Sequence, residues 1–344
     1  MINRDTQLCM SLAGRPGNFG TRFHNYLYEK LGLNFIYKAF TTQDIEAAVK
    51  GVRALGIRGC AVSMPFKENC MPFLDAIDPS ASVIDSVNTI VNDNGTLTGF
   101  NTDYIAVKSL IASHQLNSSA RVMIRGSGGM GKAVIAAFRD AGFTDVIIAA
   151  RNRESGTTLA KQYGFQWQPQ PDGIACDILV NVTPVGMAGG KESHELAYSE
   201  AMVAAASVVF DVVALPPETP VIKLAQQLGK KTISGAEVIA LQAVEQFAMY
   251  TGVRPDDELI AEAAEFAREL CCDDHMVTAG GAADRAGVRA GDYLLAADGK
   301  ETLSSADLLR ARWQHHVGDE MTLTLWRRGE ILTVTLELTE AVEK

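Results

Sequence analysis

The sequence predicts an α/β protein of several domains that ends in a small, mostly β module. Over the first 270 residues, short apolar segments alternate with segments of helical periodicity, as in parallel strands joined by helices. From residue 271 the pattern changes to short strands in which apolar and polar side chains alternate. Residues 271–344 hold 8 basic and 13 acidic residues, so they carry −5 of the net charge of −10, which marks a separate module.

Composition limits the class of protein. The 344 residues are 47% hydrophobic and 21% charged, which allows large buried cores. The negative charge argues against nucleic acid or an anionic membrane as the main partner. The six cysteines lack the spacing of a zinc site, and no signal peptide is recognisable. We therefore expect a cytoplasmic protein without a structural metal.

The first hundred residues are predicted to form strands at 8–13, 35–40 and 59–63, with helices at 22–31 and 45–55. Gly32 and Gly56 directly follow the two helices, where glycine commonly ends a helix. Strands separated by helices of this length form a parallel sheet that helices cover on both faces. This region is therefore expected to be an open α/β domain.

A second series of elements follows a polar break at residues 117–119. We predict strands at 121–125, 145–150, 178–182 and 208–213, and helices at 132–141 and 257–270. The crossovers between these strands are expected to be right-handed. In the last region we predict a helix at about 305–315 and a hairpin whose strands contain 321–325 and 332–338, with a turn at 327–330.

A glycine-rich loop joins the strand 121–125 to the helix 132–141. Its glycines, at the G-x-G-x-x-G spacing with one addition, are Gly126, Gly128, Gly129 and Gly131. Gly126 permits a tight turn, Gly128 lets the backbone approach a pyrophosphate, and Gly131 allows close packing of helix on strand. The free N–H groups of the helix would receive the phosphates. Because the motif follows a strand and opens a helix, it favours a Rossmann dinucleotide-binding domain over an ordinary glycine-rich turn.

The end of the next strand indicates which dinucleotide is bound. A site for NAD usually has a carboxylate there, which binds the ribose 2′-hydroxyl. This sequence has Arg151 and Arg153 instead, and two guanidinium groups suit a 2′-phosphate. The cofactor is therefore predicted to be NADP, with solvated arginines as the alternative interpretation.

Three polar residues are candidates for the chemistry. Lys67 stands just past the strand 59–63, at the carboxyl edge where open α/β sheets build their sites, Asp103 lies in a turn, and Asn88 lies between them in the sequence. Each has a structural alternative: Lys67 as a solvated lysine, Asp103 as the N-cap of a helix that begins at Tyr104, and Asn88 as a turn former.

Taken in order, these motifs resemble the shikimate dehydrogenase family from about residue 8 to residue 270. Six segments carry the resemblance: Gly59 with Val62-Ser63-x-Pro65-Phe66-Lys67, Val87-Asn88-Thr89, Gly99-Phe100-Asn101-Thr102-Asp103, the loop Gly126–Gly131, Asn181-Val182-Thr183-Pro184-x-Gly186-Met187, and Gly235-Ala236 followed by Leu241-Gln242.

The resemblance implies reversible hydride transfer between NADP and an alcohol carbon of shikimate, or of a related cyclic polyhydroxy acid, which gives the 3-dehydro ketone. Lys67 and Asp103 would be the catalytic pair. Loss of hydride leaves a ketone only if the hydroxyl proton also leaves, so the reaction needs a positioned acid–base group. Which of the two residues acts as the base stays open.

The resemblance also implies roles for other residues. Ser63, Asn88 and Gln242 would bind substrate hydroxyls. The cofactor would contact a set of residues that the family motifs place around it, namely Asn181, Thr183, Met187, Gly235 and Arg151. Met187 and Gly235 would line the nicotinamide pocket. Arg153 is a second candidate for the 2′-phosphate and lies outside the matched motif.

One segment departs from the family pattern. Family members usually carry Ser-x-Ser-Pro near the first strand, and its hydroxyls bind the substrate carboxylate. The matching residues here are Asn18-Phe19-Gly20-Thr21. Loss of two hydrogen bonds to a charged group costs about 1.5–3 kcal/mol each if nothing replaces them. Asn18, Thr21 and Arg22 are the candidate replacements, and the pattern resembles a divergent shikimate dehydrogenase-like subgroup.

The tail has a resemblance of its own. Residues 279–300 resemble the middle of a bacterial PDZ domain, and the helix and hairpin predicted after them agree with it. A PDZ domain binds a peptide as an added strand beside a carboxylate-binding loop. No such loop precedes Val277, so we expect the tail to dock on its own enzyme or to support oligomerisation rather than to bind peptides.

These interpretations predict three units: a substrate-binding and catalytic domain of residues 1–104 and 237–270, a Rossmann domain of residues 105–236, and a PDZ-like module of residues 271–344. The leading hypothesis is an NADP-dependent oxidoreductase. The alternative is a catalytically weak NADP-binding sensor or scaffold that acts through its PDZ-like tail. Besides a small-molecule substrate, a homodimer and a protein contact through the tail are the partners considered.

Overall fold

The computed structural model describes residues 2–14, 17–171, 173–187, 191–214, 216, 218–268, 277, 281–289, 292–302, 305–327 and 330–339. The chain forms two compact units, Met1–Ala264 and Glu265–Lys344. The predicted start of the tail module, residue 271, lies outside the described residues. Across the described residues no helix is long and apolar enough to cross a membrane, and no three potential metal ligands form a cluster.

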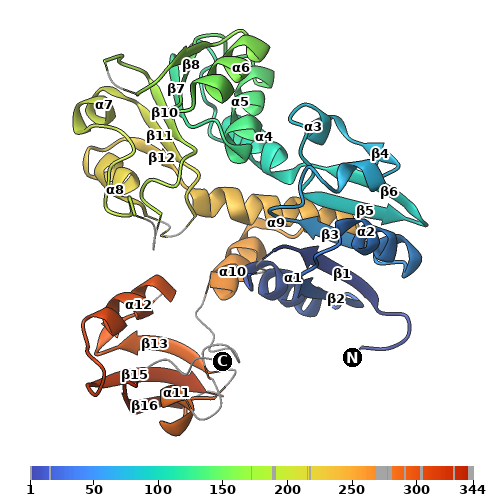
Figure 1. Ribbon diagram of the computed structural model, residues 1–344, viewed down its shortest axis with the longest axis vertical. Helices are drawn as coiled ribbons and strands as arrows, with labels where there is room; N and C mark the ends of the chain where they lie inside the picture. Colours follow the sequence, from blue (N-terminus) through green and yellow to red (C-terminus); the bar gives the residue numbers. More distant parts are fainter. Residues whose placement is uncertain are drawn as a thin grey trace. The chain divides into compact units, whose positions relative to one another are not determined.

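The first sheet has six strands in the order β2-β1-β3-β5-β6-β4 (Figure 1). They are β1 (Gln7–Leu12), β2 (Phe35–Phe40), β3 (Gly59–Val62), β4 (Ala76–Ile77), β5 (Thr89–Asp93) and β6 (Thr96–Phe100). The parallel pairing of β1 with β2 and β3 confirms the prediction, but β5 runs antiparallel to both β3 and β6, so the sheet is mixed. Asn94 and Gly95, with φ of 52° and 93°, make the tight turn between β5 and β6. This Asn-Gly pair was a hairpin signal that the prediction of a parallel sheet overlooked.

Helices cover both faces of this sheet, as predicted. On one face, α2 (Ile45–Ala54) packs Val49 and Val52 in the same core as Cys60 of β3. On the other, α1 (Phe19–Lys30) and α9 (Gly235–Thr251) lie over Tyr37, whose ring stacks on His24 with 4.4 Å between the ring centroids. Two further helical segments belong to this unit, η1 (Met71–Phe73) and α3 (Pro79–Ser82), and α10 (Asp257–Arg268) begins in it and ends in the second unit.

The second sheet is parallel throughout, in the order β12-β11-β10-β7-β8-β9. Its strands are β7 (Val122–Arg125), β8 (Val146–Ala149), β9 (Gln166–Gln168), β10 (Ile178–Asn181), β11 (Val208–Asp211) and β12 (Lys231–Ile233). Counted within this sheet, the order is 3-2-1-4-5-6, which is that of the Rossmann fold, and it confirms the predicted fold class. The strand order reverses between β7 and β10, and such a point is where dinucleotides bind.

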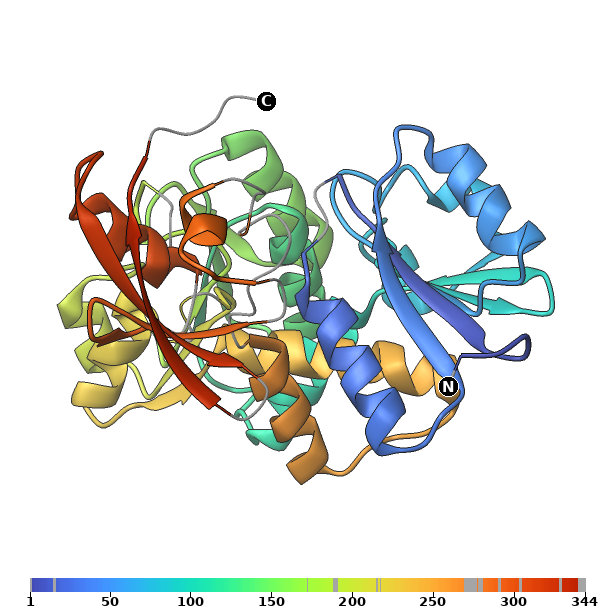
Figure 2. The same cartoon turned by 90° about the horizontal axis from the view of Figure 1, so that it is seen from below.

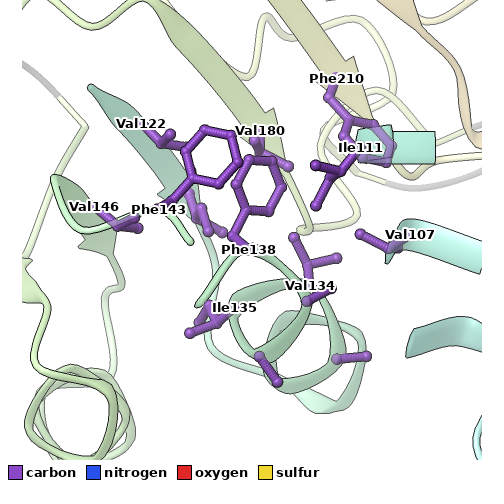
Figure 3. Packing of buried hydrophobic residues seen from close by; sticks show 14 of the residues in the cluster. Val107, Ile111, Val122, Val134, Ile135, Phe138, Phe143, Val146, Val180 and Phe210 are labelled. Carbon is purple, nitrogen blue, oxygen red and sulfur yellow. The ribbon is translucent and has the colours of Figure 1, made fainter. Parts of the chain in front are cut away.

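Two helical layers enclose this sheet. Five helices accompany it: α4 (Thr102–Ser113), α5 (Gly129–Asp140), α6 (Arg153–Tyr163), α7 (Glu200–Ala205) and α8 (Pro220–Gln227). Phe138 and Val134 of α5 pack with Val180 and Phe210 of the strands on one face (Figure 3). Met202 of α7 and helix α8 cover the other face. The Gly-rich loop therefore sits at the end of a strand that is buried from both sides.

Helix α9 connects the two sheets. At its N-terminal end a Cβ added to Gly235 would lie 2.3 Å from the carbonyl carbon and oxygen of Val213, which follows β11. At its other end, Tyr250 covers Gly59 of β3 so closely that a Cβ there would be 2.2 Å from the Tyr250 ring. Figure 2 shows the same helix, in gold, running between the two sheets. The helix therefore packs closely against both sheets, one at each of its ends.

The second unit is a small antiparallel sheet with two helices. Its elements are α11 (Ala282–Arg285), β13 (Tyr293–Ala297), β14 (Lys300–Glu301), α12 (Ser305–Trp313), β15 (Glu320–Arg327) and β16 (Glu330–Glu337), with the strand order β14-β13-β15-β16. The predicted helix and hairpin are confirmed, while residues 328 and 329 of the predicted turn lie outside the described residues. Arg327 donates to buried Asp292 through Nε (2.5 Å) and Nη2 (2.6 Å), and this ion pair lowers the pKa of the Asp292 carboxyl.

Candidate active site

A lysine–carboxylate pair lies at the carboxyl edge of the first sheet. Lys67 follows β3, and Asp103 lies in the first turn of α4. Lys67 Nζ donates to Asp103 Oδ2 over 2.8 Å, and the two side chains are only 30% and 16% exposed. The fold thus brings together two residues that are 36 positions apart, as the catalytic prediction requires. The interpretation of Lys67 as a freely solvated lysine does not fit this geometry.

The helix cap beside this pair is Asn101, not Asp103. Asn101 Oδ1 accepts from the backbone N–H of Tyr104 at 3.0 Å, and its Nδ2 donates to the carbonyl oxygen of Ser86 at 2.8 Å. With the cap supplied by Asn101, the Asp103 carboxylate is left to face Lys67. The cap interpretation of Asp103 is therefore wrong.

Asn88 presents an unpaired donor beside the same edge. It precedes β5, is 3% exposed, and its carbonyl oxygen accepts the hydrogen bond of Val62 N at 2.7 Å. Its side-chain oxygen accepts from Thr102 N (2.8 Å), Thr102 Oγ1 (3.1 Å) and Thr89 Oγ1 (2.8 Å). Its Nδ2 is buried and has no partner among the described residues. An unmade bond of a buried donor costs about 1–3 kcal/mol, which is compatible with the substrate role predicted for Asn88, and that role stays a prediction.

The other predicted substrate residues lie on three different segments. Ser63 is exposed directly after β3, and Asn18 is exposed directly before α1. Gln242 is half-buried on α9, one helical turn before Gln246, whose Nε2 reaches the carbonyl oxygen of Asn88 at 3.4 Å. These positions agree with the predicted substrate roles, which stay predictions.

The glycine-rich loop has the form that a pyrophosphate needs. Gly126 has φ of +122°, and a Cβ there would lie 2.8 Å from Val182 Cγ2. A Cβ at Gly131 would lie 3.1 Å from the Gly126 carbonyl oxygen, whereas Gly128 and Gly129 face open space. The N-cap of α5 is Gly128, which has no side chain to cap the first N–H groups of the helix, so these groups fit a phosphate. The residues present therefore fit a dinucleotide.

Two arginines stand at the adjoining helix. Arg151 is 74% exposed, and Arg153 stacks over the Trp167 ring with 5.6 Å from its guanidinium carbon to the ring centroid. Arg151 Nη1 also lies 3.9 Å from Glu192 Oε1. Glu192 was missed because only carboxylates at the end of β8 were considered in the sequence, and it lies far from that position. Contact of either guanidinium group with a 2′-phosphate stays a prediction.

The remaining residues predicted to contact the cofactor lie at the end of β10, in the turn after it and at the start of α9. Asn181 is fully buried, and its Oδ1 accepts from Thr183 N (3.1 Å) and Thr183 Oγ1 (2.6 Å), so this pair shapes the turn after β10. Met187 is 41% exposed at the end of that turn. Gly235 has a packing reason of its own, the contact with Val213. Whether these residues also touch a cofactor stays a prediction.

A buried carboxyl group beside this turn was missed from the sequence. Asp211, at the end of β11, accepts from Thr219 Oγ1 (2.6 Å), Asn181 Nδ2 (3.0 Å) and Val213 N (3.0 Å). Burial raises its pKa to about 6, although these three hydrogen bonds oppose the rise. A residue at the end of a buried strand gives no local signal for such a network, because Asn181 lies on another strand and Thr219 lies eight residues further along the chain.

Asp211 is expected to make stability depend on pH. Because its folded pKa lies above the unfolded value of 3.8, the folded state binds more protons between about pH 4 and pH 6, and stability falls as the pH rises through this range. Asp211→Asn cannot ionise, so its free energy of unfolding relative to wild type should rise by up to about 3 kcal/mol between pH 4 and pH 7. Urea unfolding at several pH values measures this difference. The exposed substitution Glu29→Gln is the control, and equal slopes for Asp211→Asn and wild type would contradict the assignment.

Comparison with known proteins identifies the family. Residues 19–90 match the shikimate dehydrogenase substrate-binding domain, and residues 110–171 match shikimate/quinate 5-dehydrogenase. A shikimate dehydrogenase-like protein of Haemophilus influenzae is 67% identical over 268 residues, which are 78% of this chain and 99% of that protein. This chain belongs to the shikimate dehydrogenase family. Residues 269–338 match the PDZ domain, so both predicted resemblances are confirmed.

Solved structures agree with the shikimate dehydrogenase fold. A shikimate 5-dehydrogenase-like protein, 67% identical, gives a TM-score of 0.77 and covers 78% of this chain and 100% of its own. Shikimate 5-dehydrogenase from Thermus thermophilus, solved with NADP(H) and shikimate, is 28% identical with a TM-score of 0.68 and covers 76% and 100%. In both cases the part of this chain that is not covered is about the size of the PDZ-like unit.

Proposed function

We propose that this chain is an NADP-dependent dehydrogenase that interconverts shikimate, or a related cyclic polyhydroxy acid, and its 3-dehydro ketone. The Lys67–Asp103 pair carries the proposal, because a 2.8 Å contact at the carboxyl edge of the sheet supplies the acid–base group that the reaction needs. The family supports the reaction class, since the Thermus thermophilus relative was solved with NADP(H) and shikimate. The sensor or scaffold alternative gains no support from relatives that are named as dehydrogenases.

The lysine–aspartate pair handles the proton of the reaction. Oxidation of the alcohol removes a hydride from carbon and a proton from oxygen, and NADP, when bound, accepts the hydride. Lys67 and Asp103 hold the reacting hydroxyl between them and take its proton as one unit; in the reverse direction they return it to the carbonyl oxygen. The unpaired Nδ2 of Asn88 donates to a neighbouring substrate oxygen and so orients the ring.

The substrate carboxylate needs donors other than the family serines. Asn18 and Gly20 stand at the positions where those serines are found, and Gly20 has no side chain to offer. The Oγ1 of Thr21, one residue further, is buried and has no partner among the described residues. We therefore assign Thr21, with Asn18, to the carboxylate end of the substrate.

A substrate panel tests the proposed function. The full chain is given shikimate, quinate and their amino analogues, each with NADP and with NAD, and formation of reduced cofactor is followed by its absorbance. We expect turnover of at least one cyclic polyhydroxy acid with NADP. Tight NADP binding without turnover of any member of the panel would contradict the proposal and favour a binding role.

Arg151 is expected to select NADP. Arg151→Ala removes a charge-assisted bond to the 2′-phosphate, which is worth about 1.5–3 kcal/mol, so KM for NADP should rise by about 10- to 100-fold while KM for NAD changes little. Initial rates at varied cofactor concentration give both constants. Arg4→Ala changes an arginine side chain that is 93% exposed and serves as the control. An equal effect on both cofactors would exclude a contact with the 2′-phosphate.

The C-terminal unit is proposed to bind a protein partner rather than to take part in the reaction. We propose that the unit Glu265–Lys344, which matches a PDZ domain, provides a protein contact, including contact with a second copy of the chain. Sedimentation velocity of the full chain at several concentrations tests self-association. A monomer at all concentrations would remove the homodimer from this proposal.

A further inference from the structure

A buried glutamine connects helix α9 to the substrate-binding edge. Gln246 is 3% exposed, although an amide side chain at such a depth must find partners to offset its desolvation. Its Nε2 donates to Thr89 Oγ1 at 3.0 Å and to the carbonyl oxygen of Asn88 at 3.4 Å. Both partners belong to the strand segment that carries the unpaired Asn88 nitrogen. Gln246 is 158 residues away from Asn88, so only the fold brings them together.

The direction of these hydrogen bonds is determined by what each group can donate. The Thr89 hydroxyl has one proton and accepts from Gln246, so that proton is free to go to Asn88 Oδ1, which lies 2.8 Å away. The same oxygen accepts from Thr102 N, which can only donate. Three donors therefore converge on Asn88 Oδ1, and they hold the amide with its Nδ2 on the side away from them.

We propose that Gln246 is a positioning residue: through the Thr89 hydroxyl it holds the Asn88 amide so that Nδ2 donates to a substrate oxygen. The proposal rests on the proposed function, because it assigns Asn88 to a substrate oxygen. Gln246 itself does not reach the substrate in this scheme. Without its amide, the Thr89 hydroxyl loses the donor that orients it, and one of the three bonds that hold Asn88 weakens.

Kinetics of matched variants test the positioning role. Gln246→Leu removes the donor, Gln246→Glu keeps the shape but offers the Thr89 hydroxyl an acceptor instead, and Thr89→Val removes the hydroxyl. Each is expected to raise KM for the substrate by about tenfold, the equivalent of ~1.4 kcal/mol, with kcat changed less than threefold.

The double variant Gln246→Leu/Thr89→Val should have a KM no higher than that of either single variant, because both substitutions act through the same hydrogen bond. Thr89→Ser keeps the hydroxyl and should have the wild-type KM. Gln226→Leu, at an exposed position on α8, is the control and should also leave KM unchanged.

A readout independent of turnover is the side-chain amide signal of Asn88. In ¹⁵N-resolved NMR of the full chain, the Asn88 NH₂ signal is identified by its loss in Asn88→Asp. We expect it to shift in Gln246→Glu and Thr89→Val but not in Thr89→Ser or Gln226→Leu. An unchanged signal in Gln246→Glu, or additive effects in the double variant, would overturn the positioning role. If no panel substrate is turned over but the signal shifts, the proposed function fails and the positioning of Asn88 by Gln246 stands.

Discussion

Lys67→Ala is expected to lower kcat for the preferred substrate by about 10²- to 10⁴-fold, the range that loss of a positioned acid–base group produces. Lys67 Nζ donates to Asp103 Oδ2 over 2.8 Å. Removal of the Lys67 amine leaves the reacting hydroxyl without its acid–base partner. Steady-state rates at saturating NADP and substrate measure the effect. KM for NADP should change much less, because among the described residues Lys67 donates to Asp103 and not to the glycine-rich loop.

Two further variants test whether the loss of turnover is specific to the Lys67–Asp103 pair. Asp103→Asn should also lose most of its turnover, because the amide cannot pair with the Lys67 ammonium as the carboxylate does. Lys50→Ala is the matched control, since Lys50 is an exposed lysine on α2 that pairs only with Glu46 among the described residues. Unchanged turnover of Lys67→Ala would remove Lys67 from the mechanism.

Gly235→Ala should be the most destabilising of the glycine substitutions in the predicted site. The added Cβ would lie 2.3 Å from backbone atoms of Val213, and backbone cannot move aside as the end of a flexible side chain can. We expect the free energy of unfolding to fall by about 1–3 kcal/mol, as in overpacked cores, with weaker NADP binding because α9 must shift away from β11. Urea unfolding and cofactor titration measure the two effects.

A second glycine supplies the control for this prediction. Gly51 lies inside α2, and a Cβ there meets nothing within 4 Å. Gly51→Ala should therefore raise stability by about 0.5–1 kcal/mol, because alanine favours the helix. If Gly235→Ala were as stable as wild type, the close approach of α9 to Val213 would be wrong.

The parts of the site that the sequence predicted are those whose chemistry is local. Gly126 needs a positive φ whatever surrounds it, and a glycine-rich segment between a strand and a helix indicates that need directly. Lys67 and Asp103 were predicted as a pair from a family resemblance, because spacing alone does not distinguish a catalytic lysine from a solvated one. The structure adds the distance between them, 2.8 Å.

The parts that were missed depend on long-range contacts. The antiparallel β5 was missed although Asn94-Gly95 marked its hairpin, because strands separated by helices dominated the pattern upstream. Asn101 and Asp103 are both good N-cap residues two positions apart, and only the folded structure shows that Asn101 caps α4 while Asp103 pairs with Lys67. Glu192, Gln246 and the contact of Asp211 with Asn181 involve partners 30 or more residues away, so no short sequence window contains these interactions.

The sequence by itself determined the fold class, the glycine-rich loop, the family and the presence of a separate tail, because helical period, glycine placement and motif order are properties of neighbouring residues. Only the tertiary structure decided the mixed first sheet, the cap of α4 and the orientation of the Asn88 amide. A hydrogen bond has a direction and a length, and both depend on where the folded backbone places groups that are up to 158 residues apart.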